Sequence, residues 1–222
     1  MIEIENFFFC LLAPILPALV FLKGEARRFN LFFVFGMTAA ISAGFLNPLL
    51  FELFKSQDNS GAIYVAPISE ELLKALPILI YILTAKPKHD SIITSSIAVG
   101  IGFATLENFV YIAGVGNTSL YFLLLRGFSA GIMHTICTIV LGYGMSRIRD
   151  KRTDPVYIFG LLSIVITNHA IYNLTATTSL SIRYFGLSFP TICVVIFALI
   201  YKRKYLATLF KKHIAPRLVS KQ

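Results

Sequence analysis

Seven ionisable side chains lie inside long apolar stretches of this sequence, and their types suit acid and base chemistry. They are Glu70, Glu71, Lys74, Glu107, Arg126, His134 and His169. A carboxylate can take a proton from water, and a histidine or a second carboxylate can protonate a leaving amine. The side-chain amide of Asn173 can stabilise an oxyanion. Together these residue types indicate hydrolysis of a peptide bond by activated water.

The densest group of charges is in residues 66–74, which read APISEELLK. Pro67 suits the first turn of a helix, so Glu70 and Glu71 lie near the positive end of the helix dipole. Lys74 follows them by four and three residues and can pair with either carboxylate. Neighbouring residues point about 100° apart on a helix, so the two glutamates cannot easily share one role. A structural ion pair at a helix start is the alternative explanation.

The third glutamate, Glu107, has no basic residue within one helical turn. Its partner must therefore come from another helix, or the carboxyl group stays protonated in the apolar surroundings. Arg126, in the next apolar stretch, is a reasonable counter-ion for one of the carboxylates. An intramembrane ionisable group of this kind indicates a functional site.

The two histidines suit either catalysis or metal binding. His169 and Asn173 are four residues apart and share one face of a helix. His134, His169 and a glutamate would form the two-histidine, one-carboxylate set of catalytic zinc sites. The alternative for each histidine is a buried ring that makes only a hydrogen bond between helices. No HExxH motif occurs, which excludes a zincin helix. All four aspartates lie in loops or near the ends of apolar stretches, which argues against an aspartyl protease.

The composition places these residues in a membrane protein. Hydrophobic residues make up 56% of the 222 residues and charged residues 14%, whereas a soluble domain has about 45–50% and about 25%. This excess excludes most soluble enzymes and nucleic-acid binders. The net charge of +9 sits in short loops and a tail, where membrane orientation explains it. Cys10, Cys137 and Cys193 show neither a zinc pattern nor a disulfide framework.

The elements that must position the site are long helices, because a membrane-spanning helix needs about 20 mostly apolar residues. The sequence predicts an all-α, polytopic membrane helix bundle with about seven transmembrane helices. The candidate spans are 7–22, 29–51, 64–84, 92–115, 119–145, 155–178 and 184–201. We expect one membrane-embedded domain over residues 1–201 and a basic cytoplasmic tail over 202–222.

The basic residues of the loops predict the orientation. Sixteen of them follow spans 1, 3, 5 and 7, whereas the opposite loops hold only Lys55 and Arg183. The positive-inside rule then places the N-terminus outside and the C-terminus inside. Counted at about 1.5 Å per residue from the outer ends, Glu70, Glu107 and His169 lie about 9–11 Å deep, and His134 about 20 Å deep. We therefore expect a polar cavity in the outer half of the bilayer, with His134 below it.

Four motifs between residues 65 and 175 follow the order and spacing of a known family. Residues 70–74, EELLK, resemble the EExxK motif of the PrsW-type intramembrane proteases. Residues 103–108, FATLEN, with Tyr111 after them, resemble the FxxxEN segment of that family. His134 and residues 169–173, HAIYN, resemble its later histidine motifs. Related CAAX-processing and bacteriocin-processing proteases more often show EExxxR, FxxxH and HxxxN, so Lys74 and Glu107 favour the PrsW branch.

The resemblance implies an intramembrane endopeptidase of the bacterial or archaeal cell membrane, with a membrane-protein substrate such as a single-span anti-sigma factor. The candidate catalytic residues are Glu70, Glu71, Glu107, His134, His169 and Asn173, and the supporting residues are Lys74, Arg126, Asn108 and Tyr111. Partly on the resemblance, we predict Glu70 as the general base and Glu71 as its support.

Two choices stay open from the sequence. Water activated by glutamate without a tightly bound metal is favoured, and zinc held by His134, His169 and Glu107 is the alternative. A proton-coupled secondary transporter with the same residues as a proton relay is a different class of function, although no internal repeat is visible. A non-enzymatic membrane scaffold is a third class.

Overall fold

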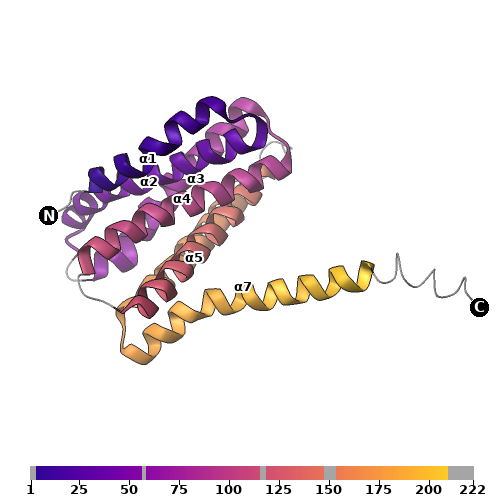
Figure 1. Ribbon diagram of the computed structural model, residues 1–222. Coiled ribbons are helices and arrows are strands. Elements are labelled where there is room, and N and C mark those ends of the chain that lie inside the picture. The colour runs from indigo at the N-terminus through magenta and orange to yellow at the C-terminus, as the bar shows by residue number, and fades with distance from the viewer. Residues whose placement is uncertain (1–3, 57–58, 116–118, 148–153, 210–222) are drawn as a thin grey trace, which may run out of the picture.

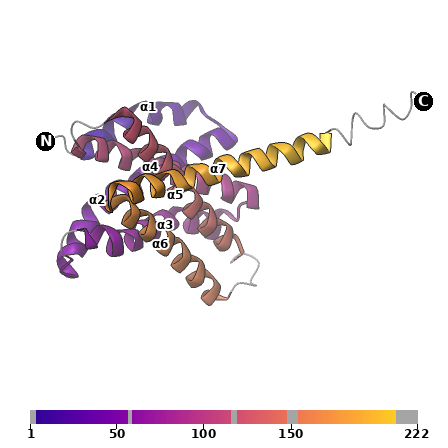
Figure 2. The same ribbon diagram turned by 90° about the horizontal axis from the view of Figure 1, so that it is seen from below.

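The computed structural model describes residues 4–56, 59–115, 119–147 and 154–209, and all regular structure in these ranges is helical. The elements are α1 (Ile4–Phe21), α2 (Gly24–Leu53), the π-helical segment η1 (Gly61–Val65), α3 (Ala66–Ala85), α4 (His89–Val115), α5 (Leu120–Ser146), α6 (Pro155–Thr177) and α7 (Leu180–Leu209). Helices α1 to α6 lie together as a bundle, and the second half of α7 projects away from it (Figures 1 and 2).

The prediction of an all-α membrane helix bundle is confirmed. Four of the described helices, within α2, α4, α5 and α6, are long and apolar enough to cross a membrane. The apolar parts of α1 and α7 are shorter, at Glu5–Phe21 and Leu180–Ile196. Helix α3 has 20 residues but carries the three charges of the EELLK motif. The number of crossings and the orientation stay predictions.

The helix bounds differ most from the predicted spans at two places. Helix α2 begins at Gly24 rather than at residue 29, so it includes charged residues next to its apolar part. Helix α7 continues to Leu209 across the predicted boundary between membrane domain and tail at residue 201. Residues 210–222 of the predicted tail lie outside the described residues. The division into a membrane domain and a tail stays a prediction.

Helix α4 lies between α2 and α5 and makes its closest approaches at glycines. A Cβ atom added to Gly102 would overlap the carbonyl oxygen of Phe33 on α2. On the α5 side, a Cβ added to Gly100 would lie 2.6 Å from the Cα of Thr135. Small residues let membrane helices approach closely. Glu107 on α4 is thereby brought within reach of side chains on α5.

Candidate active site

The first half of α3 carries charged side chains into the centre of the bundle. Pro67 lies in the first turn, as the sequence predicts. Glu71 and Lys74 are both fully buried, because this face of α3 packs against α2, α5 and α6. The segment η1 leads directly into α3, and the amide of Asn173 on α6 donates a hydrogen bond to the carbonyl oxygen of Ala62 in η1 at 2.9 Å. Asn173 thus secures the segment from which α3 begins.

Glu71 is the partner of both Lys74 and His169. Its Oε1 accepts hydrogen bonds from Lys74 Nζ at 2.7 Å and from His169 Nδ1 at 2.8 Å. The Glu71 carboxylate therefore fixes the His169 proton on Nδ1 and leaves the lone pair on Nε2, which lies 3.6 Å from Glu70 Oε2. Carboxylates that hold a histidine in this way orient it for metal binding or for proton transfer. The observed pairing of Lys74 is with Glu71 rather than with Glu70.

The chain of hydrogen bonds continues from Lys74 to α5 and α4. Lys74 Nζ donates to His134 Nδ1 at 2.9 Å, and the opposite nitrogen, Nε2, donates to Glu107 Oε2 at 2.7 Å. Arg126 pairs with the other oxygen of Glu107 at 3.1 Å. The partner of Glu107 therefore comes from another helix, as the sequence predicts.

The remaining supporting residues surround Arg126. Its guanidinium donates to the side-chain oxygen of Asn108 and stacks 4.1 Å above the ring of Tyr111. Asn108 in turn donates to the backbone carbonyl of Gly127 at 3.3 Å. A guanidinium held on three sides is a fixed positive charge beside Glu107. These contacts indicate that Asn108 and Tyr111 act on the site through Arg126.

His134 lies within the cluster, and the prediction that it sits about 9 Å deeper than the other residues is wrong. Its ring centroid is 4.9 Å from that of His169, and the two rings are nearly perpendicular. The depth estimate counted each span from its own outer end, as if all helices were parallel and began at one level. The packing of α5 against both α3 and α4 brings His134 into contact with Lys74 and Glu107.

One oxygen of Glu70 has its hydrogen-bond partner on α2, where sequence reasoning found none for it. Asn47 on α2 donates to Glu70 Oε1 at 3.1 Å, and the hydroxyl of Ser69 donates to the Asn47 side-chain oxygen. The available signal in the sequence is an amide side chain inside the predicted span 29–51. An amide side chain in an apolar span does not show which residue it contacts, because that contact depends on how α2 packs against α3.

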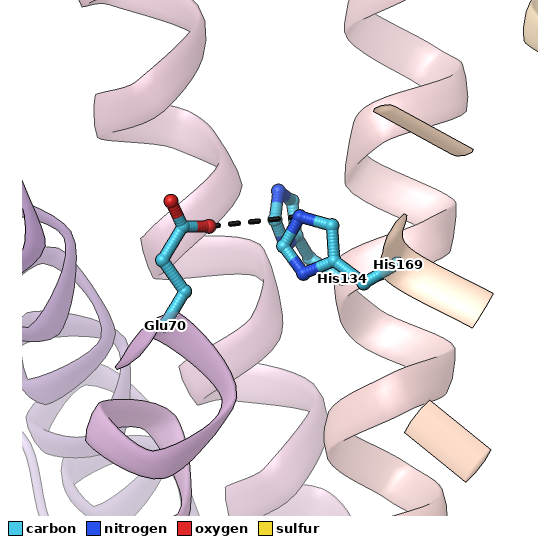
Figure 3. A group of neighbouring side chains, drawn as sticks. All are labelled: Glu70, His134 and His169. Atoms are coloured by element: carbon cyan, nitrogen blue, oxygen red, sulfur yellow. Dashed lines mark ion pairs between the residues drawn. The ribbon is translucent and has the colours of Figure 1, made fainter. Parts of the chain in front are cut away.

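Glu70, His134 and His169 approach one another from α3, α5 and α6 (Figure 3). One possible ligand atom of each lies within 4.8 Å of the others. Two histidines and one carboxylate form a common protein set for a catalytic metal. The set that the structure brings together contains Glu70, where the sequence-based alternative had Glu107.

The charges and hydrogen bonds of this group fit a cation. When all three carboxyl groups are ionised, Glu70, Glu71 and Glu107 carry three negative charges, against the two cationic side chains Lys74 and Arg126. The Oε2 atom of Glu70 is buried without a hydrogen-bond partner, and it lies 3.6 Å from His169 Nε2. With the His169 proton on Nδ1 and the Glu70 carboxyl group ionised, both of these facing atoms are acceptors. Two facing acceptors and an excess of negative charge suit a metal ion.

A cavity of about 110 Å³ opens beside the cluster between α2, α3 and α4. Glu70 and Glu107 both contribute to its wall, and so does Asn47. A water molecule takes about 30 Å³ in the liquid, so the cavity has room for a reacting water next to two carboxylates. Buried carboxylates and imidazoles beside such a cavity, inside apolar helices, are typical of a hydrolytic enzyme of the membrane.

Comparison with known proteins identifies the family. The model of the PrsW family of intramembrane metalloproteases matches residues 26–201, most of the chain, and the chain belongs to this family. Protease PrsW of Clostridioides difficile (strain 630) is 27% identical over 186 residues, which cover 76% of this chain and 78% of that protein. No solved structure matches the chain.

The family membership confirms several predictions from the sequence. The chain is a peptidase, it is a multi-pass membrane protein, and its substrate is a membrane protein. The alternative of a secondary transporter is not favoured. The description of the family as metalloproteases supports the predicted alternative in which a metal takes part.

Proposed function

We propose that this chain is an endopeptidase of the bacterial or archaeal cell membrane that cuts a single-span membrane protein, such as an anti-sigma factor. The family resemblance supports this substrate class. The uneven distribution of basic loop residues supports an N-terminus outside, which puts the cluster in the outer half of the bilayer. Residues 1–201 form the protease domain in this proposal, and the basic tail lies in the cytoplasm.

The metal-binding residues in this proposal are Glu70, His134 and His169. The observation that carries it is the pair of buried acceptors, Glu70 Oε2 and His169 Nε2, which face each other at 3.6 Å. A divalent metal such as zinc, when bound there, would polarise a peptide carbonyl and acidify water. Both ring nitrogens of His134 are hydrogen-bonded, so its participation would release either Lys74 or Glu107.

Glu107 is the general base of the proposed reaction. Its side chain is 34% exposed and lines the same cavity as Glu70. Arg126 favours the ionised carboxylate, which takes a proton from water as the oxygen of that water attacks the peptide carbonyl. The same carboxyl group then gives the proton to the leaving amine, and the C–N bond breaks. This division of roles differs from the sequence-based assignment of the base to Glu70.

Glu71 and Lys74 position the histidines in this scheme. Glu71 keeps the Nε2 lone pair of His169 directed toward Glu70, and Lys74 links Glu71 to His134. Neither side chain is exposed to the cavity, because both are fully buried. Their replacement is expected to weaken metal binding and to leave the identity of the base unchanged.

Metal content and cleavage, measured on the same purified proteins, test the assignment. We expect about one divalent metal per chain in the wild type. Glu70→Gln should lose most of the metal and the cleavage of a single-span model substrate. Glu107→Gln should keep the metal and lower the cleavage rate by about 10²- to 10⁴-fold. Glu25→Gln, on an exposed glutamate of α2, is the matched control and should behave as the wild type.

Two outcomes would contradict the proposal. A Glu70→Gln protein that keeps its metal would remove Glu70 from the ligand set. A wild-type protein that cleaves its substrate at full rate after prolonged chelation, with no metal left by elemental analysis, would reject the metal itself and restore glutamate-activated water as the mechanism.

A further inference from the structure

A second cavity, of about 320 Å³, lies between α4, α5, α6 and α7. Its wall includes Arg126, Tyr172, Asn173 and Arg183. Protein pockets that bind ligands begin at about 300 Å³, so this cavity is large enough for a side chain of another protein. Arg126 connects it to the candidate active site, because the same guanidinium pairs with Glu107.

Positive charge exceeds negative charge in this cavity. The charge of Arg126 is matched by Glu107, whereas Arg183 makes no ion pair within the described part of the chain. One terminal nitrogen of Arg183 donates to the carbonyl oxygen of Thr178 at 3.1 Å, and its Nε is buried without a hydrogen-bond partner. A partly buried guanidinium with an unsatisfied N–H group is destabilising unless it finds an acceptor, and an anionic acceptor also balances its charge.

The position of Arg183 in the chain is also unusual for a basic residue. On the predicted topology the outer loops hold two basic residues, Lys55 and Arg183, against sixteen on the inner side. Lys55 is exposed, whereas Arg183 is half-buried at the start of α7 and lines the cavity. Arg183 is therefore a cationic side chain that faces this cavity and could meet an anion there.

We propose that this cavity is a specificity subsite for an acidic side chain of the substrate, which Arg183 and Arg126 bind beside the peptide bond to be cleaved. The proposal rests on the proposed function, since it places the subsite next to Glu107. A guanidinium matches a carboxylate with two parallel N–H groups. A lipid phosphate offers similar chemistry, but the cavity shares Arg126 with the site of cleavage, which the substrate chain must reach.

A substrate series with one charged residue tests the subsite. In a single-span model substrate, an aspartate is placed at successive positions around the cut, and lysine and asparagine are placed at the same positions. Cleavage is measured in a phosphate-free detergent. We expect the wild type to prefer aspartate over lysine at one position by about tenfold or more in kcat/KM. Arg183→Glu should reverse this preference, and Arg183→Gln should remove the difference between aspartate and asparagine.

Lys55→Glu is the matched control, because it reverses the other outer basic residue in an exposed position, and it should keep the preference of the wild type. The proposal is overturned if Arg183→Glu lowers the cleavage of the aspartate and lysine substrates by the same factor. It is also overturned if the wild type shows no preference for aspartate. A third contradicting result is that adding anionic lipid to the detergent, with the substrates unchanged, alters the effect of Arg183→Glu on cleavage. A wild type that cleaves no substrate of the series would instead contradict the proposed function and the subsite together.

Discussion

Replacing Lys74 by methionine tests whether charge holds the buried hydrogen-bond chain together. Lys74 and Glu71 are fully buried, and Nζ lies 2.7 Å from Glu71 Oε1 and 2.9 Å from His134 Nδ1. Lys74→Met keeps a long side chain but leaves the Glu71 carboxylate buried without its cation. Removal of one partner of a buried ion pair costs about 3–5 kcal/mol. Because His169 still donates to Glu71 at 2.8 Å, we expect a loss near the lower end, about 3 kcal/mol.

The second half of the test is the double variant Lys74→Met/Glu71→Gln. Glutamine removes the stranded charge and keeps an oxygen that can accept from His169. The double variant should therefore be more stable than Lys74→Met alone by about 2 kcal/mol. The free energy of unfolding is measured by titration with a denaturing detergent. Lys88→Met, in an exposed position, is the control and should change it by less than about 0.5 kcal/mol.

The result that would refute this reasoning is additivity. If the separate effects of Lys74→Met and Glu71→Gln simply add in the double variant, the two charges do not depend on each other. A loss of less than about 1 kcal/mol for Lys74→Met, as for an exposed pair, would show that the cluster is hydrated rather than buried.

Three further predictions concern the packing, the orientation and the metal site. Gly102→Ala should lower the thermal unfolding temperature, because its Cβ would overlap the backbone of α2, whereas Gly160→Ala, whose Cβ would meet no atom within 4 Å, should not. In a variant without the exposed cysteines, a cysteine at Asn59 should react with an impermeant thiol reagent added outside cells and one at Lys88 should not; the reverse pattern would overturn the topology. Asn47→Ala should weaken metal binding by about 10- to 100-fold in a competition with a chelator, and an unchanged affinity would show that Glu70 does not depend on this hydrogen bond.

The helices and the membership of the cluster were largely predictable from local patterns. Long apolar runs predict helices in a membrane because backbone polar groups must be paired inside the segment. The i, i+3 spacing of Glu71 and Lys74 predicts that they can pair, and the structure pairs them. The isolation of Glu107 from local basic residues predicts a partner on another helix, and Arg126 is that partner.

The parts that could not be predicted depend on how helices cross. Asn47 contacts Glu70 because α2 packs against α3, and the sequence near either residue does not predict this contact. Asn173 shares a helix face with His169, which suggested a role in stabilising an oxyanion, yet its amide donates to the backbone of η1. The π-helical segment itself has no clear sequence signal. The level of His134 was misjudged because a count of residues along one helix contains no information on the tilt of its neighbours.

The geometry also explains why two adjacent glutamates are needed beside a single histidine. Successive residues of a helix point about 100° apart, so Glu70 and Glu71 approach the ring of His169 from different directions. Glu71 Oε1 lies 2.8 Å from Nδ1, and Glu70 Oε2 lies 3.6 Å from Nε2. The imidazole is thus placed between two carboxylates: Glu71 accepts the proton of Nδ1, and Glu70 lies beside Nε2 and also lines the cavity. Because the two nitrogens have opposite hydrogen-bonding roles, neither glutamate can take over the function of the other.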